Sequence, residues 1–284
     1  MPGMKKKSIE AVICKKIDNW LESITDVNVR RIAKDNCIVS GGCIASMLLD
    51  EEINDYDIYF RTKDAAIKVA QYYIDTWKTL NPNGVRPEIK ETKIVNIRGE
   101  DEERITIFVK SSGTAGDVEA PKKTKGKKLC YDPVFLTDNA ITLTDRIQLV
   151  IRFFGEPSQI HDNYDFVHAM NYYERRTNKV TFHPEALEAI LAKTLVYKGS
   201  LYPICSLFRI RKFVERGWRI SAGEMLKIVW QVSELNLHDF NTIREQLIGV
   251  DVSYMLELIS KLKAKNLETV DSAMMTKLIN ELYE

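Results

Sequence analysis

The sequence predicts an α+β fold, in which a mixed sheet flanked by helices (residues 1–180) precedes an all-helical domain (residues 181–284). Three observations predict it. Helical and strand-like segments alternate over the first 80 residues, and the stretch from 89 to 173 is rich in β-forming residues. From Pro184 onward, apolar residues recur at helical spacing to the end of the chain.

The first elements follow from local spacing. Ile9, Ile13 and Ile17 recur at helical spacing after Ser8, a candidate N-cap, which predicts a helix over 8–23. Cys37-Ile38-Val39 is a short apolar run that stops at two glycines, so a strand is expected to enter a tight turn there. The other elements expected before residue 80 are helices over 26–34, 43–49 and 62–79 and a strand over 55–60, with Thr62 or Asp64 as the cap of the last helix.

The later elements are strands first and helices afterwards. Strands are expected over 89–97, 104–110, 132–136, 146–153 and 165–173. Residues 112–128 predict an exposed loop, because they combine glycines with a run of lysines. Helices are expected near 184–197, 202–217, 221–235, 238–248, 252–264 and 270–283.

Composition excludes several classes of protein. The 284 residues are 45% hydrophobic and 29% charged, as in ordinary globular proteins. Lys and Arg number 41 against 40 Asp and Glu, which excludes a uniformly basic nucleic-acid coat but allows a local basic patch. The five cysteines are an odd number without a Cys-x-x-Cys pair, which favours reduced thiols over disulfides or zinc.

The N-terminal region carries no predicted leader. Three lysines are followed by an amphipathic segment rather than an apolar run, so no signal peptide is expected. No stretch approaches the roughly 18 apolar residues that a membrane span needs. We therefore expect a cytoplasmic protein without a membrane partner, in the host cytoplasm if a phage encodes it.

The segment with the clearest chemistry is Ser40-Gly41-Gly42, followed after twelve residues by Asp55-Tyr56-Asp57. Two carboxylates at i and i+2 of a strand point to the same face. Their mutual repulsion favours a divalent cation with oxygen ligands, Mg²⁺ or Mn²⁺. The glycine turn and the helix N-terminus after it allow a phosphate to approach the backbone. The pattern predicts a site for a metal-bound nucleoside triphosphate.

The segment IVSGGCIASMLLDEEINDYDIYF resembles the nucleotidyltransferase superfamily of polymerase β-like folds, especially the tRNA nucleotidyltransferase and poly(A) polymerase branch. The chain layout is similar to that of nucleotidyltransferases of large phages. The resemblance implies a nucleotidyltransferase-type sheet, two bound ions and a third catalytic carboxylate on a later strand. Asp165 in NYDFVHAM is the best match for this carboxylate, ahead of Glu102, Glu103 and Asp117.

Further nucleotide contacts are expected from basic side chains. Arg209, Lys212 and Arg216 lie on one face of a predicted helix that resembles the arginine-containing helix of nucleotide-adding enzymes. Arg146 and Arg152 are expected to face one way on their strand, and Arg152 is a candidate contact to the triphosphate. An RNA backbone suits the lysines of the exposed loop, which are Lys122, Lys123, Lys125, Lys127 and Lys128.

The resemblance has limits. Class II bacterial enzymes carry an Arg-Arg-Asp-x-Thr-x-Asn-Ala segment, and Thr137-Asp138-Asn139-Ala140 matches only its end, without the arginine pair. The base-reading Glu-Asp-x-x-Arg motif has an echo in residues 100–104, outside the helical half. A preference for one base is therefore not implied.

These observations predict a metal-dependent enzyme that transfers a nucleoside monophosphate from a triphosphate to an acceptor hydroxyl and releases pyrophosphate. Asp55 and Asp57 would bind both ions, and Asp165 the one that activates the acceptor. Ser40, Gly41 and Gly42 would contact the nucleotide, with ATP or CTP favoured and an RNA 3′ end, such as that of tRNA, as acceptor. Two alternatives stay open: a toxin-like enzyme that modifies a protein or a small molecule, and a binding or structural protein that keeps the fold without turnover.

Overall fold

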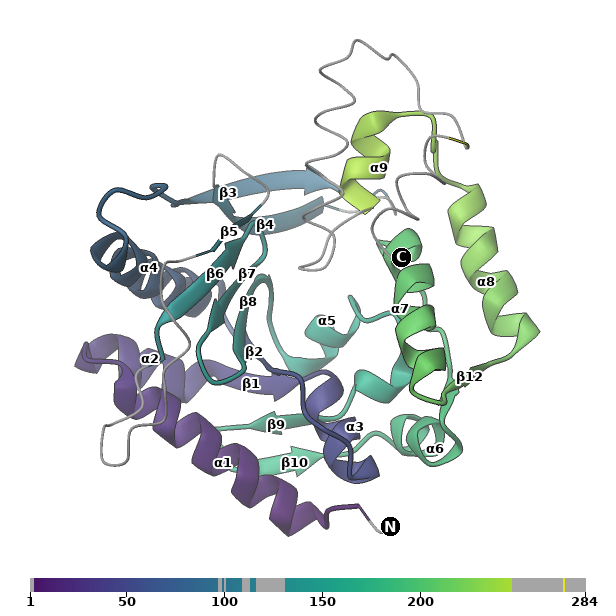
Figure 1. The fold of residues 1–284 in the computed structure, drawn as a ribbon, viewed down its shortest axis with the longest axis horizontal. Helices are drawn as coiled ribbons and strands as arrows, with labels where there is room; N and C mark the ends of the chain where they lie inside the picture. The colour runs from purple at the N-terminus through teal and green to yellow at the C-terminus, as the bar shows by residue number, and fades with distance from the viewer. Residues whose placement is uncertain are drawn as a thin grey trace.

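The fold is built on one eight-stranded mixed sheet, with strand order β10-β9-β1-β2-β8-β7-β6-β5 (Figure 1). The computed structural model describes residues 3–96, 99, 101–108, 113–115, 131–246 and 273. Within this sheet, β2 and β8 run parallel and the other neighbouring strands antiparallel. The strands are β1 Cys37–Ser40, β2 Tyr56–Phe60, β5 Gly113–Ala115, β6 Pro133–Thr137, β7 Ala140–Leu143, β8 Ile147–Phe154, β9 Tyr172–Glu174 and β10 Lys179–Thr181.

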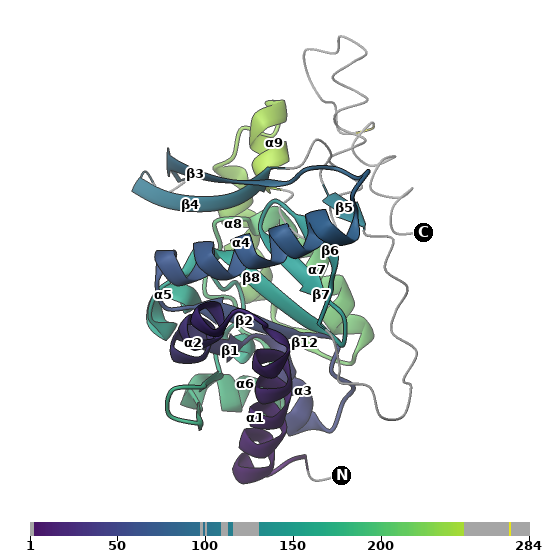
Figure 2. The ribbon, with the colours of Figure 1, turned by 90° about the vertical axis from the view of Figure 1, so that its left-hand side faces the viewer.

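Three helices cover one side of this sheet, as Figures 1 and 2 show: α1 (Lys6–Ser23), α2 (Val27–Asn36) and α4 (Lys63–Leu80). Their apolar faces form the main core with the strands, and Trp20 and Tyr73 join α1 to α4 by a hydrogen bond of 2.8 Å in that core. The Thr62 side chain accepts from the backbone N–H of Ala65, so the expected cap of α4 is confirmed.

A separate hairpin, β3 (Glu88–Val95) with β4 (Asp101–Phe108), lies next to β8. Ile105 and Ile107 of β4 are fully buried in the main core, whereas Glu102, Arg104 and Thr106 on the other side of the strand are partly buried and Phe108 is exposed. The strands expected over 89–97 and 104–110 are therefore present, and β4 begins three residues earlier than expected.

The helical part begins after β10 and consists of α6 (Pro184–Ala192), α7 (Pro203–Glu215), α8 (Ala222–Ser233) and α9 (Phe240–Gln246). It has its own small core, in which His168 lies between Phe213 and Trp218 at ring-centroid distances of 4.6 and 4.5 Å. One short parallel pair, β11 (Thr194–Leu195) with β12 (Arg219–Ile220), interrupts the expected all-helical pattern. None of the described helices is long and apolar enough to cross a bilayer.

The strand expected over 165–173 is largely absent from the structure. The backbone of Asp165 and Val167 instead bonds to residues 196–198 of the helical part, through Lys198 N–H to Asp165 O at 2.8 Å and Val167 N–H to Val196 O at 3.0 Å. A 3₁₀ turn (Val167–Ala169) follows, and only Tyr172–Glu174 joins the main sheet. Residues 165–167 and 196–198 lie far apart in the sequence, so the local pattern did not predict that they pair.

Several elements were not expected: β5, β7, β10, the hairpin turn between β7 and β8, and the short helix α5 (Pro157–His161), which contacts β8. The helix expected over 43–49 is present as α3 (Gly42–Leu49). The helices expected over 252–264 and 270–283, apart from residue 273, and most of the loop over 112–128 lie outside the described residues.

Candidate active site

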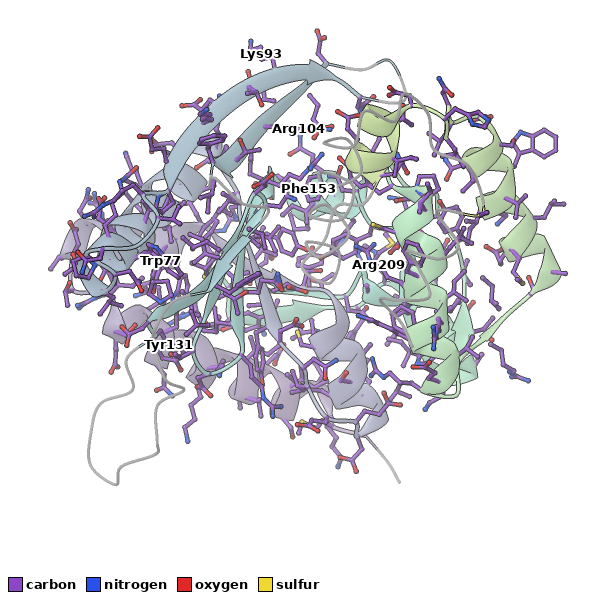
Figure 3. All side chains as sticks on the ribbon, turned by 45° about the horizontal axis from the view of Figure 1, so that its top comes forward. Trp77, Lys93, Arg104, Tyr131, Phe153 and Arg209 are labelled. Atoms are coloured by element: carbon purple, nitrogen blue, oxygen red, sulfur yellow. The ribbon has the colours of Figure 1, made fainter. Side chains whose placement is uncertain are left out.

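A cleft of about 620 Å³ lies between the sheet and α7. Side chains of β2, β7 and β8 line one side of it, and side chains of α7 with the segment before it line the other. In Figure 3, Phe153 is labelled near the middle of the molecule and Arg209 next to α7, while Trp77 and Tyr131 lie on the helix-covered side. The cleft is therefore formed by the uncovered side of the sheet and the helical part.

Asp55 and Asp57 both line this cleft, from the start of β2. The i, i+2 spacing puts them on one side of the strand, as the sequence predicts. Asp55 is exposed and Asp57 half-buried. Burial, and then the charge of Asp55, raise the pKa of Asp57 well above its usual range, and only Arg209 acts in the opposite direction. A cation would relieve the cost of ionising both acids.

Gly41 lies directly against Asp57. Its φ of +93° and ψ of −155° belong to a region that is essentially restricted to glycine. A Cβ at this position would stand 2.6 Å from Asp57 Oδ2. Gly41 therefore makes room for the carboxylate, and it brings the start of α3 beside Asp57. Gly42 begins α3, and a Cβ there would meet nothing within 4 Å.

Ser40 does not line the cleft. Its side chain is fully buried and donates to the carbonyl of Asn171 at 3.1 Å, while His161 Nε2 lies 3.0 Å from the same hydroxyl. Burial and the nearby His183 and Lys198 lower the pKa of His161 to about 4, so the ring is neutral. Because the hydroxyl has one proton, the ring donates to Ser40. Ser40 thus connects β1 to the segment after Asp165.

Asp165 is not brought together with Asp55 and Asp57. Its carboxylate accepts from Arg209 Nη1 at 2.6 Å and from Ser206 Oγ at 3.1 Å, both on α7, and it does not line the cleft. Within the described part of the chain, no three His, Cys, Asp or Glu side chains form a group that could hold a metal. The reason is the pairing of 165–167 with the helical part, which removes Asp165 from the sheet.

Gln148 is the residue that lies next to Asp57 on the neighbouring strand. In the parallel pair of β2 and β8, Asp57 is the register partner of Gln148, and Thr142 of β7 is the next residue across the sheet. All three line the cleft. A neutral amide therefore occupies the position next to the acidic pair. The competing acids are not found there: Glu102 and Glu103 lie on β4, and Asp117 lies outside the described residues.

The basic face expected on α7 is divided. Arg209 and Lys212 line the cleft, and Asp165 raises the pKa of Arg209 more than its burial lowers it. Arg216, at the end of the helix, pairs with Glu51 at 2.6 Å. Lys193 pairs with the same carboxylate at 2.7 Å, so this cluster joins the end of α3 to the helical part. Arg216 is thus away from the cleft lining.

Arg146 and Arg152 both line the cleft, but only Arg152 lies on β8, because Arg146 belongs to the turn before that strand. Arg146 holds the loop before Asp55, through Glu52 at 2.7 Å and the carbonyl of Ile53. Asp145 and Arg146 have φ values of +59° and +61°, so two of the three residues of the β7–β8 turn are in the left-handed region. This turn directs the Arg146 side chain toward the loop that carries Asp55.

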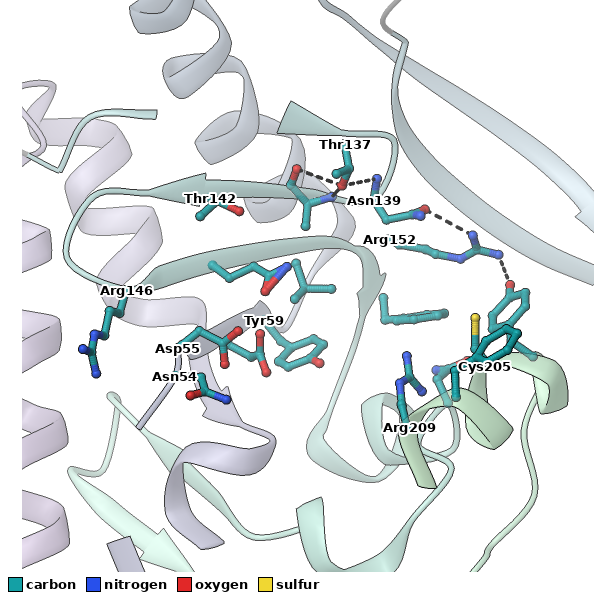
Figure 4. Close-up of a pocket in the computed structure, with 18 of the residues that line it drawn as sticks. Asn54, Asp55, Tyr59, Thr137, Asn139, Thr142, Arg146, Arg152, Cys205 and Arg209 are labelled. Atoms are coloured by element: carbon teal, nitrogen blue, oxygen red, sulfur yellow. Dashed lines mark hydrogen bonds between the residues drawn. The ribbon is translucent and has the colours of Figure 1, made fainter. Parts of the chain in front are cut away.

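Arg152 is held in a buried polar cluster at the other end of the cleft, 3% exposed (Figure 4). Its Nη1 donates to Asn139 Oδ1 at 3.1 Å and its Nη2 to Tyr202 Oη, which also accepts from Arg104 at 3.2 Å. Glu102 lies 3.7 Å from the guanidinium. Burial, and then Arg104, lower the pKa of Arg152 to about 9.

The sequence did not predict the lining residues that the β6–β7 hairpin and the segment before α7 contribute, which are Thr137, Asn139, Thr142, Ser200 and Tyr202. The Thr-x-Asn-Ala match at 137–140 was a signal for two of them, and it was set aside because the arginine pair is missing. The five lysines of the loop lie outside the described residues.

The diglycine turn, the helix after it and the acidic pair on the next strand, set in a mixed sheet, define a nucleotidyltransferase-like fold. The chain belongs to the Gabija anti-defense 2 family, whose model matches residues 11–193. It is 23% identical over 224 residues to Gabija anti-defense 2 of Bacillus phage SPbetaL7. The match covers 78% of this chain and 44% of the relative, so the chain spans less than half of the relative's length.

Solved structures with a similar arrangement are CCA-adding enzymes. The enzyme of Thermotoga maritima in complex with tRNA matches with a TM-score of 0.40 and 12% identity, over 92% of this chain and 55% of that one. A CCA-adding enzyme in complex with ATP matches with a TM-score of 0.40 and 14% identity, over 87% and 51%. These TM-scores are too low to transfer any property of the CCA-adding enzymes, so the site is interpreted from the geometry of this chain alone.

Proposed function

We propose that the protein is a metal-dependent nucleotidyltransferase, which transfers a nucleoside monophosphate from a triphosphate to an acceptor hydroxyl. The acceptor oxygen forms a bond to the α-phosphorus, the bond to the β-phosphate oxygen breaks, pyrophosphate leaves and the hydroxyl proton is released. The observation that carries the proposal is the acidic pair: Asp55 and Asp57 face the cleft, and Gly41 leaves room for Asp57.

The donor set fits Mg²⁺ or Mn²⁺. Asp55 and Asp57 offer carboxylate oxygens, and Gln148 offers an amide oxygen beside them, which are hard ligands of the kind these ions prefer. The raised pKa of Asp57 is the cost that a bound cation would remove. When bound, such ions lower the pKa of the acceptor hydroxyl and neutralise charge on the phosphates.

The protein's own side chains would position the substrate. Arg209 and Lys212 extend from α7 into the cleft opposite the acidic pair, where they can hold phosphate oxygens. Asp165 and Ser206 fix the Arg209 guanidinium through one carboxylate oxygen. We propose this positioning role for Asp165 in place of the predicted metal contact. Catalysis then depends mainly on orientation and electrostatics.

For the acceptor, we propose an RNA 3′ end. The resemblance to tRNA nucleotidyltransferases supports it, as does the run of lysines in 121–128, which suits an RNA backbone. The family name favours a second candidate, in which the acceptor is a component of the host's Gabija defence and its modification counters that defence.

A labelling experiment tests the proposal. The protein is incubated with each α-³²P-labelled triphosphate, Mg²⁺ and host lysate, and the RNA, protein and small-molecule pools are separated. Wild type and the control Lys227→Gln, an exposed residue of α8, should label one pool, while Asp57→Asn should label none. If wild type labels no pool, and Mg²⁺ with triphosphate does not raise its melting temperature, the protein is a binding protein that keeps the fold.

A further inference from the structure

Helix α8 carries apolar side chains on two sides, and its inner side is fixed by contacts to the segment before α7. Glu224 accepts from the backbone N–H of Tyr197 at 2.6 Å, and Gln231 accepts from the hydroxyl of the same tyrosine at 2.5 Å. Ile228, between them along the helix, is fully buried in the small core of the helical part. These contacts show which side of α8 faces inward.

The outer side of α8 is apolar as well. Four large side chains on it are solvent-exposed: Met225 by 48%, Leu226 by 59%, Val229 by 54% and Trp230 by 67%. Their spacing of i, i+1, i+4 and i+5 makes one continuous strip along the helix, which we call the α8 face. A helix that is apolar on both sides is normally buried, and a continuous apolar strip on a surface marks an interaction site.

The chain leaves α9 close to this helix. Figure 1 shows α9 beside the upper ends of α7 and α8, and α7 contacts both of the other helices. Gln246, the last residue of α9, donates from its side chain to the carbonyl of Leu201 at 2.9 Å, and its own carbonyl accepts from Cys205 Sγ at 3.0 Å. The next segment therefore starts beside the beginning of α7, at the end of the helical part where the last turn of α8 carries Trp230.

Residues 252–264 come next in the sequence and lie outside the described residues. Apolar residues recur in them at i, i+3, i+4, i+7 and i+10, which are Val252, Met255, Leu256, Ile259 and Leu262. A helix over this segment would be about 20 Å long, close to the length of α8. The connection over 247–251 can span about 17 Å, more than the about 8–10 Å between the axes of packed helices.

We propose that the α8 face is an intramolecular docking surface, and that residues 252–264 form a helix whose apolar side packs on it. This segment is the occupant because it follows α9 after a short connection, matches α8 in length and carries an apolar strip of its own. Packing the two strips together removes both from water. The inference is independent of the proposed function, since the α8 face contributes no residue to the cleft lining.

Tryptophan fluorescence of the full chain tests the docking. The chain has four tryptophans, of which Trp20, Trp77 and Trp218 are buried, so quenching by acrylamide reports on the cover over Trp230. Comparison with Trp230→Phe isolates the signal of this residue. In wild type, we expect Trp230 to be shielded from acrylamide at every protein concentration.

A matched pair of variants identifies the segment that covers Trp230. Ile259→Asp places a charge in the apolar strip of residues 252–264, where burial is costly, so quenching should increase and the emission maximum should shift to longer wavelength. Lys261→Asp introduces the same side chain about 200° further around the predicted helix, on its polar side, and should leave both readouts as in wild type.

Three results would overturn the inference. Full quenching of Trp230 in wild type would show that the α8 face is bare, and shielding that is lost on dilution would show that a second copy of the chain covers it. Shielding that persists in Ile259→Asp would show that a different segment covers it. If Ile259→Asp does not fold, the three buried tryptophans are quenched too, and the milder Ile259→Ala replaces it, with increased quenching of Trp230 alone as the expected result.

Discussion

Replacing Gly41 by alanine tests the contact on which the acidic site depends. The backbone at Gly41, with φ +93° and ψ −155°, costs a non-glycine residue about 1–3 kcal/mol. The new Cβ would also stand 2.6 Å from Asp57 Oδ2, a contact that forces the carboxylate out of its position and costs about 1–3 kcal/mol as overpacking. We therefore expect Gly41→Ala to lower the free energy of unfolding by about 2–6 kcal/mol and to weaken Mg²⁺-dependent triphosphate binding.

A double-mutant cycle with Asp57→Ala separates the two costs. Without the carboxylate, only the backbone strain remains. In the Asp57→Ala background, Gly41→Ala should therefore lower the free energy of unfolding by about 1–3 kcal/mol less than it does in wild type. Urea unfolding of wild type, both single variants and the double variant measures the coupling. The matched control is Gly42→Ala, where a Cβ meets nothing and alanine favours the helix, so stability should stay or rise. Additive effects of Gly41→Ala and Asp57→Ala would refute the contact.

The remaining predictions concern charge at and near the cleft. Asp57→Asn should abolish transfer and leave stability equal or slightly higher, because it removes repulsion from Asp55. The pKa of Asp57 is raised in the folded state, so protonation of this carboxyl favours folding. Relative to Asp57→Asn, metal-free wild type should therefore be most stable below pH about 4 and should lose stability as the pH rises through the folded-state pKa. Urea unfolding at several pH values measures this difference in the free energy of unfolding. Arg209→Gln should weaken triphosphate binding about tenfold, whereas Arg216→Gln should cost at most about 1 kcal/mol of stability and leave binding unchanged, by calorimetry. Arg146→Gly should relieve about 1 kcal/mol of left-handed strain but release the Ile53 carbonyl, so triphosphate affinity should fall while the melting temperature changes little.

The parts of the site that sequence could predict are those that local geometry fixes. The i, i+2 spacing of Asp55 and Asp57 puts both on one side of a strand wherever that strand lies, and a glycine turn before a helix brings the helix start to the end of β1. Alternation on β8 likewise gives Arg152 the direction of Gln148 and Val150, and all three line the cleft, whereas Arg146 lies in the turn before the strand. Each of these predictions needs only the conformation of one short segment.

The predictions that the geometry does not support involve long-range pairing. Asp165 was placed with the acids from its apolar surroundings, but those residues pack on the helical part, where Phe166 contacts Tyr197 and Phe213. Arg216 shares a helical face with Arg209, yet the helix ends there and Glu51 binds it. Spacing along one helix cannot tell which carboxylate from another segment will reach it.

The sequence by itself determined the α+β class, the order of most elements and the acidic pair beside a glycine turn, because periodicity and backbone preference act within a few residues. The tertiary structure alone decided that Gln148 lies next to Asp57, that Asp165 holds Arg209, and that Asn139 and Arg152 meet at the far end of the cleft. Strand register and the packing of α7 against the sheet set these contacts, and both depend on the whole core rather than on any single segment.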